Sequence, residues 1–193
     1  MEACETFPEL RAEEWIPPLA RPNWFERWEL RGLVPDLWSR WVEILIGAAG
    51  MGYPSVHFDS FMTHAWARQM HGTKRFRLWP PFAGQPSHLS HEFRTHVLAA
   101  QGRDVKTLLG HSLPSEIVLN AGDILFIPAG WWHLTEILAT SVTLSGNFVN
   151  DSNWRDFAAA WGPTRGRRGR LHLAAASTVL LARSRVTSAM RPS

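Results

Sequence analysis

The feature that most constrains the fold of this chain is a series of short runs, rich in β-branched and aromatic residues, across residues 42–148. Glycine or proline stands between many of these runs, and both residues favour turns over continued strands. Many short strands in succession are typical of a β-sandwich or a small barrel. The sequence therefore predicts an all-β core. The predicted strands cover residues 42–47, 55–58, 64–70, 74–79, 116–119, 123–127, 131–137 and 140–148.

The segments outside these runs have a different composition. Residues 1–41 are rich in proline and tryptophan, which predicts short helices and turns packed on the barrel. Residues 81–114 are a polar, histidine-containing insert, in which SHEFRTHVLAAQG could form a helix outside the barrel. We expect one domain with three parts. These are the N-terminal segment 1–41, the barrel 42–149 and the C-terminal segment 150–193.

The C-terminal segment is predicted to contain two helices. Asp151 or Ser152 can cap a helix through NWRDFAAAWG, which Gly162 and Pro163 would end. A second helix is expected over roughly 170–184. Its apolar stretch LHLAAASTVLLA could pack against a second copy as a homodimer, or fold back on its own barrel.

The charge of the chain is unevenly distributed. Residues 157–193 hold seven arginines and no acidic residue, whereas residues 1–156 carry a net charge of −4. A basic tail can contact nucleic acid or another polyanion. The alternative is a solvated amphipathic helix, because charge alone specifies no partner.

The cysteine content and the distribution of apolar residues bear on the cellular compartment of the protein. Cys4 is the only cysteine, so the chain cannot form an internal disulfide or a cluster of thiolate metal ligands. The acidic first residues lack the order of a secretory signal, and no apolar run approaches the roughly 18 residues of a membrane span. The sequence therefore predicts a cytoplasmic protein without membrane contact.

The stretch PSVHFDSF, residues 54–61, places a histidine and an aspartate on one face of a predicted strand. Successive side chains of a strand alternate, so His57 and Asp59 point to the same side. A buried carboxylate is costly unless it is paired or binds a metal. His133, in GDILFIPAGWWHLTEI, is the third candidate. Two histidines and one carboxylate with open coordination positions are the donor set that holds non-haem Fe(II).

A lysine in GTKRFRLWPP adds a second indication of a binding site. Alternation places Lys74 on the same face as Phe76 and Leu78, so it faces the core if they do, and an inward lysine needs an anion. Side chains of the last predicted strand could bind the same ligand; they are Thr143, Ser145 and Asn147. The alternative is that Lys74 extends to the rim and that these polar groups bind the backbone.

These motifs together resemble a known family. HFDSFMTHAWARQMHGTKRFRLWPP, followed by GDILFIPAGWWHLTEILATSVTLSGNF, is similar to the JmjC or cupin-like Fe(II)- and 2-oxoglutarate-dependent oxygenases. The resemblance is to the phosphatidylserine-receptor-like branch, which contains the jumonji-type lysyl hydroxylase. It implies a double-stranded β-helix, or jelly roll, with helices at both ends. It also implies Fe(II), 2-oxoglutarate as cosubstrate, and O₂.

The resemblance also implies a role for individual residues. His57, Asp59 and His133 would be the iron ligands, and Lys74 would bind the distal carboxylate of 2-oxoglutarate. The remaining positions would shape the cosubstrate site: Ser145 would assist the lysine, Asn147 would lie near the proximal carboxylate, and Thr63 and Trp66 would form the wall.

The sequence departs from the family pattern at several places. Ala67 and Ile137 stand where the branch usually has asparagines. The family normally has further strands before ELRAEEW, one of which supplies a tyrosine to 2-oxoglutarate. Either another subunit or the tryptophan-rich N-terminal segment closes the barrel, or the chain is a shortened member with a more open site.

The expected activity is hydroxylation of a C–H bond, most simply on a protein or peptide side chain, with release of succinate and CO₂. A small-molecule substrate is an alternative, and N-methyl-lysine demethylation uses the same chemistry. A non-catalytic cupin-like binding module with a degenerate site is the rival from another class. A zinc or manganese cupin is a further alternative, although it would not need an inward Lys74.

Overall fold

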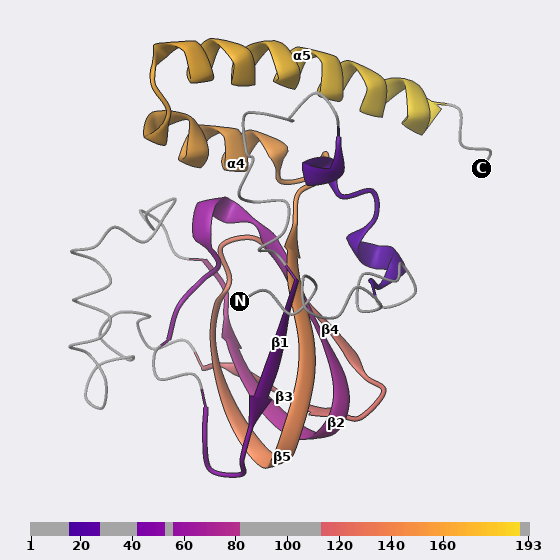
Figure 1. Cartoon of the computed structure of the whole chain (residues 1–193), viewed down its shortest axis with the longest axis vertical. Helices are drawn as coiled ribbons and strands as arrows, with labels where there is room; N and C mark the ends of the chain where they lie inside the picture. The colour runs from indigo at the N-terminus through magenta and orange to yellow at the C-terminus, as the bar shows by residue number, and fades with distance from the viewer. Residues whose placement is uncertain (1–15, 28–41, 53–55, 82–112, 190–193) are drawn as a thin grey trace.

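The computed structural model describes residues 16–27, 42–52, 56–81 and 113–189, with the backbone alone for residues 183–189. An antiparallel sheet forms the body of the molecule, and two helices lie across one end of it (Figure 1). The strands are β1 Val42–Gly47, β2 His64–Trp79, β3 Ser115–Asn120, β4 Ile124–Ile127 and β5 Trp132–Phe148. The helices are α4 Trp154–Trp161 and α5 Arg167–Ala189, with short 3-10 turns η3 Pro18–Ala20, η4 Trp24–Glu26, η6 Ser60–Met62 and η7 Gly162–Thr164.

Two long strands, β2 and β5, organise the sheet. They pair antiparallel over their whole length, from the His64–Phe148 pair to the Leu78–His133 and Trp79–Trp132 pairs. β1 pairs with the other edge of β5, while β3 and β4 follow one another along the other edge of β2. The prediction of an all-β jelly-roll core is confirmed. The predicted strand at 55–58 is the exception: in its described residues, 56–58, only His57 pairs, through an isolated bridge to His133, so this run is not a strand.

The predicted breaks near residues 70–74 and 138–140 are irregularities within the long strands. The β2–β5 register shifts between Gln69 and Lys74. Gly72 has φ +73°, and a Cβ there would collide with the carbonyl oxygen of Thr140. Only glycine fits this position without strain. The two long strands can therefore bend together at this point, as the curved sheet shows (Figure 1).

A buried polar network lies beside this bend. Gln69 donates hydrogen bonds to the His71 carbonyl (2.7 Å) and the Ser141 hydroxyl (2.8 Å), and it accepts one from Thr143 (2.8 Å). Gln69, Ser141 and Thr143 are fully buried. Thr143, predicted to face a ligand, is instead bonded within the core, so this network holds the two strands together at the bend.

The two faces of β2 pack into different clusters. On one face, Ala65, Ala67, Phe76 and Leu78 are buried with residues of β3 and β4. On the other face, Trp66 packs with Ala20, Leu144 and Phe148. The first cluster lies inside the curved sheet, and the second includes Ile16 and Ala20 of the described N-terminal residues.

The helices cover one end of the sheet through an aromatic core. Its members are Trp24, Phe25, Val149, Trp154, Phe157, Trp161, Leu173, Ala176 and Leu180. The apolar side of α5 therefore packs on its own chain, while Leu171 and Val179 stay exposed. Helix α5 begins three residues earlier than predicted and ends later, so it includes part of the arginine run. No helix in the described part of the chain is long and apolar enough to cross a membrane.

The predicted cap of α4 is wrong. The cap residue is Asn153, not Asp151 or Ser152, and its side chain makes no capping bond. Asn153 instead accepts a hydrogen bond from the Asn150 amide and donates one to the Met62 carbonyl. The Ser152 hydroxyl donates a hydrogen bond to the Asn150 side chain and not to the start of the helix.

Some predictions fall outside the described residues. Nearly all of the 81–114 insert and its predicted helix do so, as do residues 1–15, 28–41 and 190–193. The division into parts at 41/42 and 149/150 therefore stays a prediction, although β1 begins at Val42 and β5 ends at Phe148.

Candidate metal and cosubstrate site

A short bridge between two chain segments brings His57 and His133 together. The His57 amide donates to the His133 carbonyl at 3.1 Å, and the His133 amide donates to the His57 carbonyl at 2.7 Å. Residues that exchange both hydrogen bonds lie directly opposite one another in an antiparallel pair. Their ring centroids are consequently 4.2 Å apart, although 76 residues separate the two histidines in the sequence.

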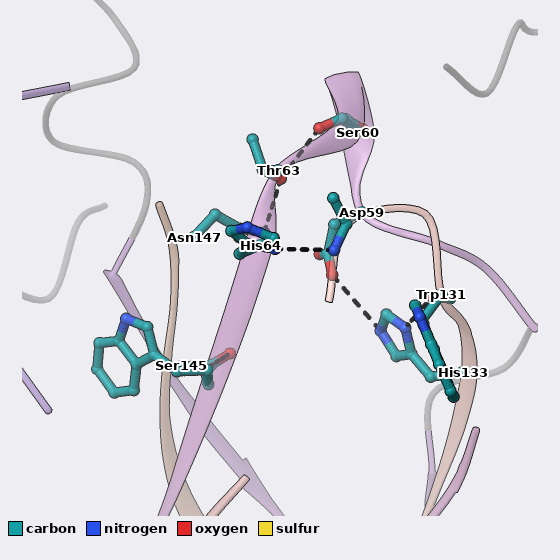
Figure 2. A network of polar contacts seen from close by, with 10 residues as sticks. Asp59, Ser60, Thr63, His64, Trp131, His133, Ser145 and Asn147 are labelled. Carbon is teal, nitrogen blue, oxygen red and sulfur yellow. Dashed lines mark hydrogen bonds and ion pairs between the residues drawn. The ribbon is translucent and has the colours of Figure 1, made fainter. Parts of the chain in front are cut away.

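Asp59 approaches His133 from the segment that precedes η6. Its Oδ2 lies 4.0 Å from His133 Nε2, and the two side chains face one another (Figure 2). This distance is too long for a hydrogen bond. The side chain of His133 is 7% exposed and that of Asp59 is 21% exposed. The structure therefore brings all three predicted iron ligands to one end of the barrel.

The second ring nitrogen of His133 has its own partner. Nδ1 lies 3.2 Å from the Trp131 carbonyl oxygen, which can only accept. The Nδ1 proton is therefore directed to Trp131, and in the neutral ring the Nε2 lone pair faces the Asp59 carboxylate. Metal-binding histidines commonly use such a carbonyl to fix their tautomer. Two electron-pair donors facing one space favour a cation between them.

The donor types fit a ferrous ion, but their spacing is wide. Imidazole and carboxylate ligands with open positions suit non-haem Fe(II). Adjacent donors that are each about 2.1 Å from a metal stand roughly 3 Å apart. Asp59 and His133 exceed this, and within the described ranges no three donors already form a closed metal-binding group. Metal binding here requires these side chains to close by about 1 Å.

Lys74 lies inside the barrel, as alternation predicted. It is 4% exposed and lies opposite Ile137 of β5 and Leu119 of β3. Burial lowers the pKa of its ammonium, because the charged form loses solvation. No other residue in the described part of the chain forms a hydrogen bond or ion pair with this ammonium. A buried charge in this state requires an anionic partner.

The neighbours of Lys74 on β2 show the contrast between the two faces. Arg75 binds Glu136 at 3.1 Å, and Arg77 binds Glu116 at 2.7 Å. These pairs are partly exposed on the outer face. Of the three cations Lys74, Arg75 and Arg77, the one that points inward, Lys74, therefore has no ion-pair partner among the described residues.

The distance between Lys74 and the donors can be estimated along β5. Ile137, opposite Lys74, is four residues from His133. At about 3.3 Å per residue, their Cα atoms are roughly 13 Å apart. A lysine side chain together with a short dicarboxylate can fill this span. Lys74 therefore lies at one end of the inner face, and the proposed metal donors around His133 lie at the other end.

The predicted polar residues Thr63, Ser145 and Asn147 contact one another or the backbone. Thr63 is fully buried; its hydroxyl donates to the Ser60 carbonyl and accepts from the Asn147 amide, both at 3.0 Å (Figure 2). Ser145 donates to the Trp66 carbonyl at 3.0 Å. Thr63 and Asn147 therefore hold each other, and the Asn147 side-chain carbonyl oxygen is not used in that bond.

Trp66 does not lie where the resemblance implied. Its side chain packs with Ala20 and Phe148, on the face of β2 opposite to Ala65 and Ala67. Alternation explains this, because residue 66 must point away from its two neighbours. The backbone carbonyl of Trp66 accepts a hydrogen bond from the site residue Ser145. His64, for which the sequence pattern indicated no role, lies directly after Thr63.

An antiparallel barrel with imidazole and carboxylate donors at one end is the arrangement that defines the cupin class. The chain belongs to the Cupin-like domain family, whose sequence model matches residues 5–154. The predicted family is confirmed.

Named relatives show what the chain is similar to. It is 30% identical over 159 residues to the lysine-specific demethylase JMJ21 of Arabidopsis thaliana, which covers 78% of this chain and 16% of the relative. It is 33% identical over 116 residues to the 2-oxoglutarate and iron-dependent oxygenase JMJD4 of Gallus gallus, covering 57% and 27%. It is 27% identical over 124 residues to the bifunctional arginine demethylase and lysyl-hydroxylase psr-1 of Caenorhabditis elegans, covering 59% and 30%. The chain thus spans less than a third of each of these relatives.

Proposed function

We propose that this chain is an Fe(II)- and 2-oxoglutarate-dependent oxygenase that hydroxylates a C–H bond. The observation that carries the proposal is the buried Lys74 ammonium, which none of the other described residues pairs, inside the same barrel as the facing donors Asp59 and His133. A binding module with a degenerate site would not maintain this costly cation. Family membership and the name of the relative JMJD4 support the same cofactors.

The residues divide into two functions. His57, Asp59 and His133 would hold the iron, and the Trp131 carbonyl orients the His133 ring. Lys74 would pair with the distal carboxylate of 2-oxoglutarate, and this would repay the desolvation of its ammonium. Asn147, held by Thr63, has an amide oxygen and a second N–H that this bond does not use, and these would lie near the proximal carboxylate of 2-oxoglutarate. Ser145 is a weaker candidate for cosubstrate binding, because its hydroxyl proton is donated to the Trp66 backbone carbonyl.

The bound cofactors supply the oxidising power: 2-oxoglutarate and O₂ give succinate and CO₂ while the substrate C–H bond becomes C–OH. The contribution of the chain is to bind, orient and exclude water. Phe58 and Trp132 pack edge to face at 4.9 Å beneath the two ligand segments, which keeps the His57–His133 bridge rigid. The inner apolar cluster keeps water from the Lys74 end.

The proposed substrate is a protein or peptide side chain. The names of two relatives specify lysine or arginine residues, and both names include demethylation, which begins with the same hydroxylation. A small-molecule substrate is tested by the same turnover assay. The homodimer, the nucleic-acid contact and the cytoplasmic location stay predictions.

The proposal is tested by anaerobic titration of the apo-protein with Fe(II) and then with 2-oxoglutarate. We expect the weak visible charge-transfer band of an iron–2-oxoglutarate chelate. Succinate release on admission of O₂ would then report turnover, with and without candidate peptides. Absence of the band at saturating Fe(II) and 2-oxoglutarate contradicts the proposal.

A further inference from the structure

His64 is a buried imidazole that the proposed chemistry does not use. It is 9% exposed, and its ring lies 5.2 Å from the rings of both Phe126 and Phe148. It stands at the start of β2, directly after Thr63 (Figure 2). The two aromatic rings leave the imidazole little freedom to rotate, so its nitrogens have defined directions.

Both nitrogens of His64 are engaged by other segments. Nδ1 accepts a hydrogen bond from the Ala129 amide at 2.9 Å. Nε2 therefore carries the proton, and it lies 2.9 Å from the Ser152 hydroxyl, which itself donates to Asn150 at 2.7 Å. The directions of all three bonds are consistent with one neutral tautomer. Burial lowers the pKa of His64 to about 4, so this tautomer persists at neutral pH.

The amide that His64 holds belongs to the turn that leads into His133. The Trp131 amide closes this turn on the Pro128 carbonyl at 3.2 Å, and Gly130 has φ +76° within it. Ala129 is four residues before His133. The tether therefore acts on the segment that supplies one proposed ligand.

The strand that carries His64 leads back to the other proposed ligand. Asp59 precedes His64 by five residues, through η6 and Thr63. Thr63 fixes that short connection by its bond to the Ser60 carbonyl. His64 consequently adds a side-chain hydrogen bond between the Asp59 segment and the His133 turn, beside the Phe58–Trp132 ring contact.

We propose that His64 is a positioning residue that holds the turn at residues 128–130 against the Asp59 segment, and so sets the separation of the Asp59 and His133 donors. This inference rests on the proposed function for its purpose, because the separation matters only if a metal binds there. Its physical content, a side-chain tether on the Ala129 amide, is independent of the metal.

Two substitutions separate the tether from the general role of a buried ring. His64→Asn keeps an oxygen near the position of Nδ1 and can still accept from Ala129. His64→Gln keeps a polar group near the position of Nε2 and loses that acceptor. Ser152→Ala is the matched control, because it removes the other partner of His64 and leaves the Ala129 bond intact.

The measurement is the dissociation constant for Fe(II), determined anaerobically, together with amide hydrogen exchange of the metal-free proteins. We expect His64→Gln to weaken Fe(II) binding by about 10-fold, at the low end for partners outside the ligands themselves. His64→Asn and Ser152→Ala should stay within about threefold of wild type. In the metal-free His64→Gln protein, the amides of Ala129 and His133 should exchange faster, whereas those of β1 and β2 stay as in wild type.

The outcomes distinguish this inference from the proposed function. Equal losses of Fe(II) affinity in His64→Asn and His64→Gln would show a merely structural ring and overturn the inference. If wild type binds no Fe(II), the proposed function fails, and amide exchange still decides the role of His64. Unchanged exchange at Ala129 and His133 in His64→Gln then overturns the tether.

Discussion

Asp59 Oδ2 and His133 Nε2 face each other across 4.0 Å, a distance too long for a hydrogen bond. The Trp131 carbonyl takes the other ring nitrogen of His133, so the facing nitrogen is the one available to a metal. This relationship is the basis of the first prediction.

Asp59→Ala should lower the affinity for Fe(II) by at least about 100-fold, because the substitution removes a proposed ligand and not merely a supporting group. The free energy of unfolding should change by less than about 1 kcal/mol, since Asp59 is partly exposed and makes no capping bond. Equilibrium dialysis and urea unfolding measure the two effects. Asp156→Ala, an exposed acid in the first turn of α4, is the control and should leave Fe(II) binding unchanged. Retained affinity in Asp59→Ala would exclude this residue as a ligand.

Lys74→Met should weaken 2-oxoglutarate binding by roughly 10- to 100-fold, which corresponds to losing a bond between charged groups. The same substitution should raise the free energy of unfolding of the ligand-free protein, because a desolvated ammonium is replaced by an apolar chain of similar length. Calorimetric titration measures the expected loss of 2-oxoglutarate affinity, and thermal unfolding measures the expected gain of stability. The control is Arg75→Met, on the opposite face of β2, which breaks an exposed pair with Glu136 and should not affect 2-oxoglutarate. If the two variants bind alike, Lys74 does not contact the cosubstrate.

The stability of the protein should depend on pH through His64. Its folded pKa of about 4 lies below the ordinary value of 6.5, so the unfolded state binds a proton first as the pH falls. The contribution is fully present above pH 6.5, decreases between about 6.5 and 4, and is worth up to about 3 kcal/mol. His64→Asn removes the titrating group and should flatten this part of the profile. Chemical unfolding at several pH values between 7.5 and 4.5 measures the difference between the two proteins, and parallel profiles would contradict it.

Gly72→Ala should destabilise the fold by more than about 2 kcal/mol, since a Cβ there meets the Thr140 carbonyl at a positive φ. Gly122→Ala is the matched control: its φ is +97°, but a Cβ would have no heavy atom within 4 Å. It should cost about 1 kcal/mol from backbone strain alone. Urea unfolding measures the free energy of unfolding of both variants. The difference between them gives the cost of the collision beyond the cost of backbone strain. Equal losses of stability would mean that the bend tolerates a side chain at residue 72.

Much of the architecture was predictable because it depends on the alternation of side chains along single strands. The strand runs from residue 42 to residue 148 were recognisable from residues that favour pleated, half-buried backbone, and glycine or proline marked many of their ends. The inward position of Lys74 followed from its spacing to Phe76 and Leu78, which are buried with it. The predicted breaks at 70–74 were partly wrong, because a bulge interrupts a ladder without ending the strand.

Contacts between distant segments could not be predicted in the same way. The bond from Asn153 to the Met62 carbonyl, the orientation of Trp66 toward Ala20, and the bond from Ser145 to the Trp66 backbone depend on which segments the register places side by side. His64 shows this most clearly: its partners Ala129 and Ser152 lie 65 and 88 residues away.

The sequence by itself determined the strands, the inward lysine and the chemical types of the proposed ligands, because these follow from side-chain period and residue chemistry within single segments. The tertiary structure alone decided that Asp59 meets His133 at 4.0 Å and that His64 joins their two segments. The physical reason is that a strand sets the face of each side chain locally, whereas the distance between side chains on different strands is set by register and packing.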